Sequence, residues 1–589
     1  MKGRFLITTA LEDTWYEDNR PVLFLGEWCK LYSNKHHWMK LDAEVVPYHW
    51  DDREKLHKDY KYLRDLFERL LVEMTGELNN IHGVNHSLRY WRILIGPWLM
   101  VFISIIYDRW ECIKAAITSY SIVDTKGYDC LDLNSIPQSM EHFSNLGKSD
   151  VWNHAIYSSI LKFVDFEKFS YLKSTDKVVS ELKFSVLPQR NMVSKIKRLA
   201  SNFSSFFSQN NNYFFIQPYL SVIDTLRLQL KLHQFPVLFQ CSNTFDIAPC
   251  AEYRELEIPS FEANNEFEQY AKRIVPFQLP LIYLEGYEKL NFIANNNGWP
   301  TKPKLIWTSS SYYMDDVFKA WSGEKVDEGV PLVIGQHGGH YGQGLFSFTE
   351  YHELSICDYY LSWGWKTNEH KVIPVGSVKR SIEKKRKRHS QNTLLFLISG
   401  TSRYSDGIAS IPISRQWIDY MDDQIAFYGN LPSHITDETI IRLYPCDYGW
   451  SQLDRWKDKY PLSNIDDGGV SFNTQLLIAK LVVSGWNSTT YLESMLSNIP
   501  TIIFWDDKYF EIREEARAIF NRLRKVGILH DNSVSAANHI KSIWNEIDVW
   551  WARPDVVSAK NDFIEKYAYA PNILNRLNSV FRNIANKKS

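Results

Sequence analysis

Short apolar runs alternate with amphipathic segments along this chain, a pattern that predicts an α/β fold built on parallel sheets. Near the start, runs at 4–9, 21–25 and 43–48 are each followed by polar and aromatic residues, where such a sheet places its ligand-facing loops. From 53 to 78, leucine and aromatic residues recur mostly every three or four positions, which predicts an amphipathic helix.

The alternation resumes after residue 276. A helical pattern at 279–292 precedes strand-like runs at 304–308, 331–334, 359–363 and 372–375. The residues before it, from about 116 to 275, are less regular and rich in serine, asparagine and phenylalanine. We predict a mostly helical insertion there.

Another series begins after a basic stretch at 379–389, whose charge run is typical of a solvated linker. Its strand-like runs lie at 393–398, 439–443, 476–483 and 501–505, with helical patterns among them. We therefore predict two Rossmann-like domains that face a cleft, with their boundary near 380–392. The predicted parts are an N-terminal domain at 1–380 with the insertion, a second domain at 393–550, and closing helices at 551–589.

Charge and cysteine content exclude several classes of protein. Lys+Arg number 67 and Asp+Glu 69, a formal net charge of -2, which argues against a nucleic-acid binder acting through bulk positive charge. The seven cysteines are scattered, without a CxxC pair or Cys/His ligand spacing. We therefore expect neither a structural zinc site nor a disulfide framework, and we expect a cytoplasmic protein.

Several catalytic motifs are missing from the sequence. It has no GxxxxGKS/T, GxSxG, HExxH or DxD motif, which favours a reaction without a metal or another cofactor. The most apolar stretch, 94–107, is shorter than the ~20 residues that span a membrane, and we predict a buried helix there. Arginine and tryptophan on both sides of it leave open a peripheral contact with the inner face of the membrane.

The strongest signal for a site lies between 475 and 505, where an apolar run, small polar residues, a short helix and a second strand follow one another. Ser488, Thr489 and Thr490 stand where this helix begins, so hydroxyls and free backbone N–H groups gather at its positive end. A phosphate fits there, and Glu493 can reach a ribose diol. Ser484 and Asn487 complete the predicted donor-binding loop. The same hydroxyls also fit an ordinary helix cap.

Two other loops are expected to face the cleft. After the strand at 331–334, Gln336 and Gly338 flank His337, which suits either a base or a donor to a phosphate. Arg442 ends another strand, where its guanidinium suits a phosphate or a carboxylate. The strand at 393–398 leads into further donor-binding candidates, or a plain turn: Ser399, Gly400, Thr401, Ser402 and Arg403.

Transfer to an acceptor hydroxyl needs a base from the domain opposite the donor-binding loop. His337 is the first candidate, with an expected pKa of about 6.5. Glu12 and Asp13 come next, because their loop follows the first strand and is expected to open into the cleft.

Long motifs link this chain to a known family. They are LITTALEDTW, VLFLGEWCKLY, VVPYHWDDR, YWRILIGPWL, IYDRW, GQHGGHYG and VVSGWNSTTYLES. Together they resemble the LIC family of transferases found with bacterial surface-polysaccharide genes. The similarity runs through most of the chain and is weakest in the middle insertion and the final helices.

A more distant resemblance concerns the GQHGG loop and the SGWNSTTYLES helix. These are similar to pieces of GT-B enzymes that use CMP- or CDP-activated donors, such as the capsule Kdo transferases and the teichoic-acid glycerophosphotransferases. The resemblance implies a GT-B-like fold in which the first domain binds the acceptor and the second binds the nucleotide. The Lys-Pro-His-Pro-like element of those enzymes appears here as Arg442-Leu443-Tyr444-Pro445, without the histidine.

We therefore expect a glycosyltransferase of bacterial surface-glycan assembly. The expected donor is a CMP-activated ulosonic acid, Kdo-like or nonulosonic, because Arg403 and Arg442 offer partners for a sugar carboxylate. The expected acceptor is a lipid-linked or polymeric glycan. The alternatives are a UDP- or GDP-hexose glycosyltransferase, a CDP-alcohol phosphotransferase, and a non-catalytic glycan-binding protein.

Overall fold

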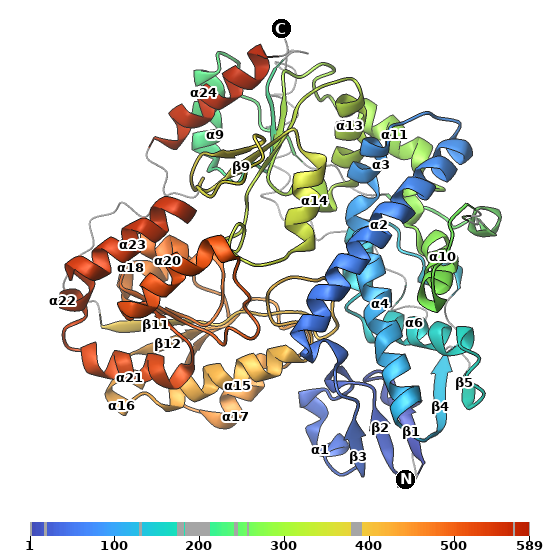
Figure 1. Ribbon diagram of the computed structural model, residues 1–589, viewed down its shortest axis with the longest axis horizontal. Coiled ribbons are helices and arrows are strands. Elements are labelled where there is room, and N and C mark those ends of the chain that lie inside the picture. Colours follow the sequence, from blue (N-terminus) through green and yellow to red (C-terminus); the bar gives the residue numbers. More distant parts are fainter. Residues whose placement is uncertain are drawn as a thin grey trace.

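The computed structural model arranges the chain as three lobes, each built around one parallel sheet (Figure 1). We call them the first, middle and last lobes, in chain order. The residues described are 3–16, 20–128, 132–172, 182, 212–240, 245–255, 258, 260–378, 392–568 and 572–587. The predicted domain boundary near 380–392 falls almost entirely outside them.

The first sheet has the strand order β3-β2-β1-β4-β5, so the order reverses between β1 and β4. Its strands are β1 (Arg4–Ile7), β2 (Val22–Phe24), β3 (Ala43–Val45), β4 (Ile122–Tyr128) and β5 (Phe169–Leu172). The helices between and beside them are α1 (Lys35–Trp38), α2 (Arg53–His82), α3 (Leu88–Leu94), α4 (Gly96–Ser119), α5 (Met140–Leu146) and α6 (Asp150–Phe163).

Helix α2 confirms the amphipathic helix predicted from the leucine spacing. The Asp52 side chain caps its start by accepting from the N–H groups of Glu54 and Lys55, and Gly83 ends it in the left-handed conformation. The helix runs beside both the first and the middle lobes (Figure 1).

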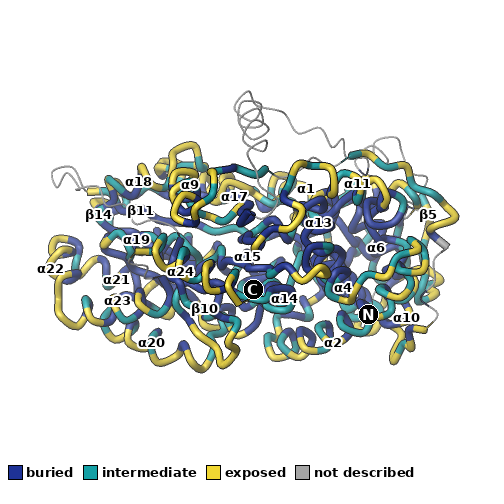
Figure 2. Tube along the Cα trace, turned by 90° about the horizontal axis from the view of Figure 1, so that it is seen from above, coloured by how far each residue is buried: buried dark blue, intermediate teal, exposed yellow. Residues whose placement is uncertain are grey.

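Helix α4 confirms the buried helix predicted over 94–107. All its residues from Gly96 to Trp110 are buried, and it packs against α2, α6 and α10 (Glu266–Gln278) (Figure 2). A helix that is apolar all round is buried in this way inside a large protein. Among the described residues no single helix is long and apolar enough to span a membrane, although α3 and α4 together meet that test with a bend of 66°.

The middle sheet has the sequential order β10-β9-β8-β7-β6. Its strands are β6 (Phe214–Ile216), β7 (Ile306–Thr308), β8 (Leu332–Gly335), β9 (Tyr359–Ser362) and β10 (Val372–Pro374). Its helices are α9 (Val222–Lys231), α11 (Tyr287–Asn295), α12 (Ser311–Met314), α13 (Asp316–Asp327) and α14 (Phe348–Ile356), while α10 lies between β6 and β7 in sequence but packs against α4.

The region at 116–275 is not an insertion, although helices outweigh strands among its described residues, as predicted. These residues supply β4 and β5 to the first sheet and β6 to the middle sheet, so the region at 1–380 contains two sheets instead of one. The apolar pattern did not indicate them because β4 carries Asp124 and Lys126 among its apolar residues, and β5 and β6 are only 4 and 3 residues long.

The last sheet has the order β13-β12-β11-β14-β15-β16, the Rossmann order with its reversal between β11 and β14. Its strands are β11 (Thr393–Leu397), β12 (Thr439–Arg442), β13 (Asn464–Asp466), β14 (Ala479–Ser484), β15 (Thr501–Phe504) and β16 (Leu529–His530). Its helices are α15 (Gln416–Gly429), α16 (Ser433–Thr436), α17 (Gln452–Lys459), α18 (Phe472–Ile478), α19 (Thr489–Leu496), α20 (Glu514–Lys525), α21 (Ser533–Ile543), α22 (Ile547–Trp551) and α23 (Pro554–Tyr567).

The final helix, α24 (Ile573–Asn586), returns to the middle lobe and lies beside α9 (Figure 1). Leu577, Phe581 and Ile584 on its apolar face pack with Phe215 and Trp307 of the middle sheet. The chain thus ties the last lobe back to the middle one. The α/β class with parallel, Rossmann-like sheets, predicted from the alternating pattern, is confirmed.

Candidate active site

Two loops predicted to face a cleft meet between the middle and last lobes. We call them the glycine loop (336–344, after β8) and the donor loop (485–490, after β14). The Gly339 N–H donates to Thr489 Oγ1 over 3.1 Å. A Cβ atom on Gly339 would lie only 2.4 Å from the carbonyl oxygen of Ser488, so the close approach of these loops requires glycine.

The donor loop ends at the start of α19, where the sequence predicts that a helix begins, and this start is uncapped. Ser488 is the N-cap of α19, with extended backbone, but its side chain accepts no hydrogen bond from the first turn. Its hydroxyl lies 2.8 Å from Thr490 Oγ1 instead. The first-turn N–H groups of α19 therefore have no side-chain cap, and two of the three hydroxyls lie together beside them, which suits an anion.

The position of this helix start in the sheet also favours a ligand. The last sheet reverses its order between β11 and β14, and the donor loop follows β14 directly. Open α/β sheets bind ligands at the carboxyl ends of the strands, at such a reversal. Glu493 lies in the second turn of α19 and is half-buried.

A hydrogen-bond chain fixes the two loops to each other. The Tyr491 hydroxyl lies 3.0 Å from both Asn487 Oδ1 and Gln343 Oε1, and Gln343 Nε2 donates to the Gly339 carbonyl over 2.7 Å. Asn487, predicted to bind the donor, therefore takes part in the link between lobes. Gln343 was missed by the sequence analysis, although it lies in the glycine-rich run that drew attention to His337.

Gln336 and Ser484 support their loops from below. Gln336 is buried, and its amide bonds the Gly338 carbonyl, the Trp363 N–H and the Trp365 indole at 2.7–2.8 Å. Ser484 is buried at the end of β14, with its hydroxyl 3.3 Å from the Trp486 carbonyl. Gln336 is predicted to bind the donor, but in the structure its amide is used within the protein, where it shapes the glycine loop.

His337 lies beside a buried carboxyl group on α14. Its Nδ1 is 3.5 Å from Glu353 Oε1, its Nε2 is 3.3 Å from the Tyr341 hydroxyl, and 24% of its side chain is exposed. Burial, with a smaller effect of His340, lowers the pKa of His337 to about 4, below the expected 6.5. The imidazole is therefore neutral at pH 7 and able to accept a proton.

Glu353 is a further residue that the sequence analysis missed. Its carboxyl group is fully buried and accepts from the hydroxyls of Tyr312, Tyr341 and Tyr360. Burial raises its pKa to about 8, although the three tyrosines act in the opposite direction. Glu353 can therefore hold a proton at neutral pH next to His337.

The loop after β11 is occupied by contacts within the protein. Arg403 is buried and bonds the Asp150 carboxylate and the Trp28 carbonyl of the first lobe. The phosphate role predicted for Arg403 is therefore wrong for this arrangement, because its charge is already paired. Aromatic side chains hold the rest of the loop. The backbone of Ser399 bonds the Tyr420 hydroxyl and the Trp417 indole, and the Thr401 carbonyl accepts from the Trp450 indole. Gly400 lies under the Tyr444 ring, and Ser402 is buried.

Arg442 is also paired within its own lobe. Its guanidinium donates to the Asp466 carboxylate over 2.5 Å, to Gln475 Oε1 over 2.8 Å and to the Val470 carbonyl over 2.6 Å. It does lie at the carboxyl end of β12, as predicted. A ligand would have to compete with Asp466 for it.

Glu12 and Asp13 follow β1 in the first lobe. Glu12 accepts from Asn34 Nδ2 over 2.9 Å and lies 3.3 Å from His37, while Asp13 is exposed. The reversal point of the first sheet is filled by protein, since His154 bonds Thr8 Oγ1 and the Tyr128 N–H there. Asp150 accepts from the Ala10 N–H beside it.

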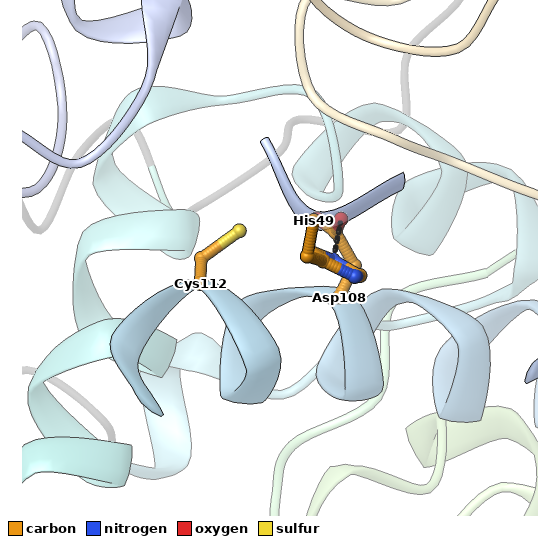
Figure 3. Close-up of side chains that lie close together, drawn as sticks. All are labelled: His49, Asp108 and Cys112. Atoms are coloured by element: carbon orange, nitrogen blue, oxygen red, sulfur yellow. Dashed lines mark hydrogen bonds and ion pairs between the residues drawn. The ribbon is translucent and has the colours of Figure 1, made fainter. Parts of the chain in front are cut away.

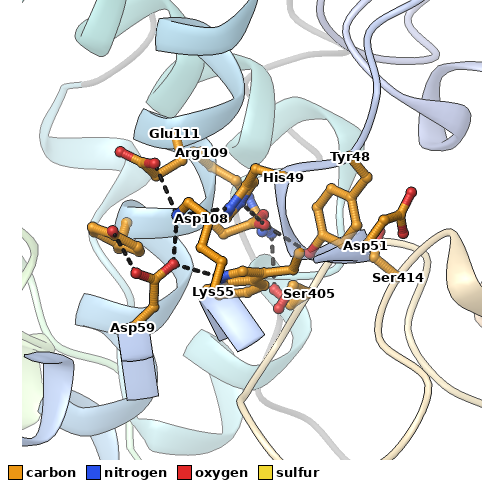
Figure 4. Close-up of polar contacts among 12 residues, drawn as sticks. Tyr48, His49, Asp51, Lys55, Asp59, Asp108, Arg109, Glu111, Ser405 and Ser414 are labelled. Carbon is orange, nitrogen blue, oxygen red and sulfur yellow. Dashed lines mark hydrogen bonds and ion pairs between the residues drawn. The ribbon is translucent and has the colours of Figure 1, made fainter. Parts of the chain in front are cut away.

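His49, Asp108 and Cys112 form the one cluster with metal-ligand spacing among the described residues (Figure 3). Asp108 already accepts from Arg109, Tyr48 and His49, and Lys55 approaches His49 to 3.5 Å (Figure 4). Burial raises the pKa of the Cys112 thiol well above its usual value. A metal ion does not suit this cluster, because the cationic side chains of Arg109 and Lys55 lie next to it and the Cys112 thiol keeps its proton.

Arg109, which donates to Asp108 of this cluster, joins two lobes. Arg109 Nη2 donates to the Ser405 carbonyl of the last lobe over 3.0 Å (Figure 4). Its Nε donates to Asn153 Oδ1 over 2.9 Å. Its role is thus to hold the first lobe against the last.

A protein-family model matches nearly the whole chain. The model for the LIC12162 family transferase matches residues 4–577. The chain belongs to this family. It is therefore a transferase, and the resemblance noted in the sequence is confirmed. No curated protein gives a significant match.

Several solved structures are similar to the chain at low identity. MurG of Acinetobacter baumannii is 12% identical, with a TM-score of 0.35, over 63% of this chain and 99% of that one. Anabaena Alr3699/HepE in complex with UDP and glucose is 10% identical, with a TM-score of 0.34, over 55% and 90%. The wall teichoic acid polymerase TagF is 10% identical, with a TM-score of 0.30, over 51% and 86%.

Proposed function

We propose that this transferase moves a sugar from a nucleotide donor to a hydroxyl of a bacterial surface glycan. The observation that carries the proposal is the uncapped start of α19, which lies at the reversal point of the last sheet and directly under the glycine loop. An uncapped helix start and a reversal of strand order both favour an anionic ligand, which would here lie between two Rossmann-like lobes.

In this proposal the donor's phosphate lies on the N–H groups and hydroxyls at the start of α19. As the bond to the sugar breaks, negative charge grows on the leaving phosphate, and the positive end of the helix stabilises it. This contribution needs no metal ion. Glu493, one turn further along α19, is proposed to accept from the ribose hydroxyls.

For the donor itself we propose a CMP-activated ulosonic acid. Arg403 and Arg442 are the arginines expected to bind the sugar carboxylate, and both are paired with carboxylates of the protein in this structure. Arg442 is the better of the two, because it is only partly buried and its partner Asp466 lies in the same lobe. A UDP- or GDP-hexose would use the same phosphate site.

The acceptor is proposed to be a lipid-linked or polymeric glycan, reached from the cytoplasm. His337 is the proposed base, since it comes from the lobe opposite α19 and is neutral at pH 7. Transfer governed by His337 should increase with pH through about 4, where the imidazole loses its proton, and then stay level toward neutral pH.

We expect His337→Ala to abolish transfer while the Kd of the nucleotide stays nearly unchanged. The measurement is product mass after incubation with CMP-, CDP-, UDP- and GDP-linked donors, together with nucleotide titration. The mass also separates sugar transfer from phospho-alcohol transfer. His434→Ala is the control, because His434 is exposed on α16.

Other outcomes would change the role proposed for His337 or for the protein. Lost nucleotide affinity in His337→Ala would make His337 a phosphate ligand and move the base to Glu12 or Asp13. Full activity would remove His337 from the site. Carbohydrate binding without release of any nucleotide would instead indicate a non-catalytic glycan-binding protein.

A further inference from the structure

Helix α9 carries large apolar side chains on both its inner face, which packs against the core, and its outer face, which is exposed. Leu228 and Leu232 pack into the core with the middle sheet. On the opposite side Val222, Ile223 and Leu230 are 55%, 61% and 61% exposed. Isolated surface leucines are common, but three on a single short helix form a stripe that marks an interaction surface.

Basic residues of α9 and of the neighbouring α24 segment accompany this stripe. Arg227 and Lys231 are exposed on α9, Arg582 is exposed on α24, and Lys587 is exposed directly after α24. The two helices lie side by side, since Arg582 NH2 donates to the Lys231 carbonyl over 2.8 Å (Figure 1). We call these residues, together with the apolar stripe, the α9–α24 surface.

Acidic charge at this surface is minimal. Within 212–240 and 572–587 the sequence has one acidic residue, Asp224. That carboxylate is buried, and it accepts from Ser221 and lies 3.4 Å from Arg227. The surface therefore combines exposed apolar chains with a net positive charge.

We propose that the α9–α24 surface binds an anionic lipid bilayer. An amphipathic helix of this type lies in the plane of the membrane, with its apolar side chains at the boundary between headgroups and acyl chains. Lysine and arginine next to the membrane are attracted by anionic lipids, with roughly a fivefold gain in affinity for each residue. The charge of the surface selects an anionic bilayer over a neutral one.

The surface lies close to the candidate active site. Tyr219, just before α9, is 40% exposed, and its ring centroid lies 5.8 Å from that of His337. A hydroxyl at the end of a lipid-linked acceptor would therefore reach His337 from the membrane side. This step rests on the proposed function, whereas lipid binding by the surface does not.

The test is co-sedimentation of the full chain with vesicles of phosphatidylglycerol and phosphatidylcholine, and with phosphatidylcholine alone. The variants are Ile223→Ser/Leu230→Ser and Lys231→Gln/Lys587→Gln. The control is Leu462→Ser/Val549→Ser, which removes two apolar residues of similar or greater exposure, 99% and 64%, from the last lobe.

We expect wild type and control to bind the anionic vesicles and to bind phosphatidylcholine at least tenfold more weakly. Each surface variant should lose at least tenfold in affinity for anionic vesicles, and added salt should weaken wild-type binding. Wild type that does not bind, or surface variants that bind as wild type does, would overturn the proposal.

Two further outcomes are informative. A dimer that dissociates in Ile223→Ser/Leu230→Ser, without lipid binding, would assign the surface to a second copy of the chain and overturn the proposal. Vesicle binding by a protein that transfers no sugar would leave the membrane surface in place and reject the proposed function alone.

Discussion

Replacing Asp150 with alanine is expected to lower the free energy of unfolding by about 3–5 kcal/mol, the usual cost of leaving one partner of a buried ion pair unpaired. Asp150 accepts from Arg403, from the Tyr404 hydroxyl over 2.6 Å, and from the Ala10 N–H over 3.2 Å. Only 6% of the Arg403 side chain is exposed, so its guanidinium would lose its partner without gaining water.

Urea denaturation followed by tryptophan fluorescence measures this change. Adding Arg403→Met to the Asp150→Ala variant should recover part of the loss, because it removes the unpaired charge. Asp458→Ala is the control, since it breaks the Lys35–Asp458 pair between the same two lobes, where both side chains are exposed. Equal stability of Asp150→Ala and Asp458→Ala would contradict the buried-pair argument.

Gly339→Ala is expected to reduce transfer by about 100-fold while the protein stays folded. The new Cβ would lie 2.4 Å from the Ser488 carbonyl oxygen, so the glycine loop and the donor loop would have to separate by about an ångström. Misplacement of that size costs on the order of 100-fold in rate when two reacting groups are held on opposite sides of a cleft.

The matched control for this prediction is Gly407→Ala. A Cβ at Gly407 meets nothing within 4 Å, and the residue lies in a loop of the last lobe. The rate of transfer and the melting temperature of both variants would be measured. A Gly339→Ala enzyme as active as the Gly407→Ala enzyme would show that the loops need not approach each other for the reaction.

Local patterns were enough to predict the start of α19. An apolar run, a hydroxyl cluster and a second strand fix the order β14, α19, β15, which the structure has. The strand β14 begins at Ala479, three residues into the predicted run, because 476–478 end helix α18. The helix start depends on residues adjacent in sequence, which is why the pattern could indicate it. Likewise, the spacing of leucines predicted α2.

Partners distant in sequence could not be predicted. Arg403 and Asp150 are 253 positions apart, so nothing near Arg403 shows that its charge is already paired. Glu353 looks like any helical glutamate, and only the tertiary fold surrounds it with three tyrosines. The first and middle sheets were merged into one domain because β5 and β6 are too short to give a periodic signal.

The measurement that tests the central claim most directly is nucleotide titration by calorimetry on wild type and on Ser488→Ala/Thr489→Ala. Ser471→Ala is the control, because Ser471 caps α18 and bonds the Thr474 N–H within its own helix. We predict that CMP or CDP binds wild type and control with the same Kd, and the double variant 5- to 150-fold more weakly, the equivalent of about 1–3 kcal/mol. Identical Kd values for all three proteins, or no binding of CMP, CDP, UDP or GDP to wild type, would contradict a donor phosphate at the start of α19.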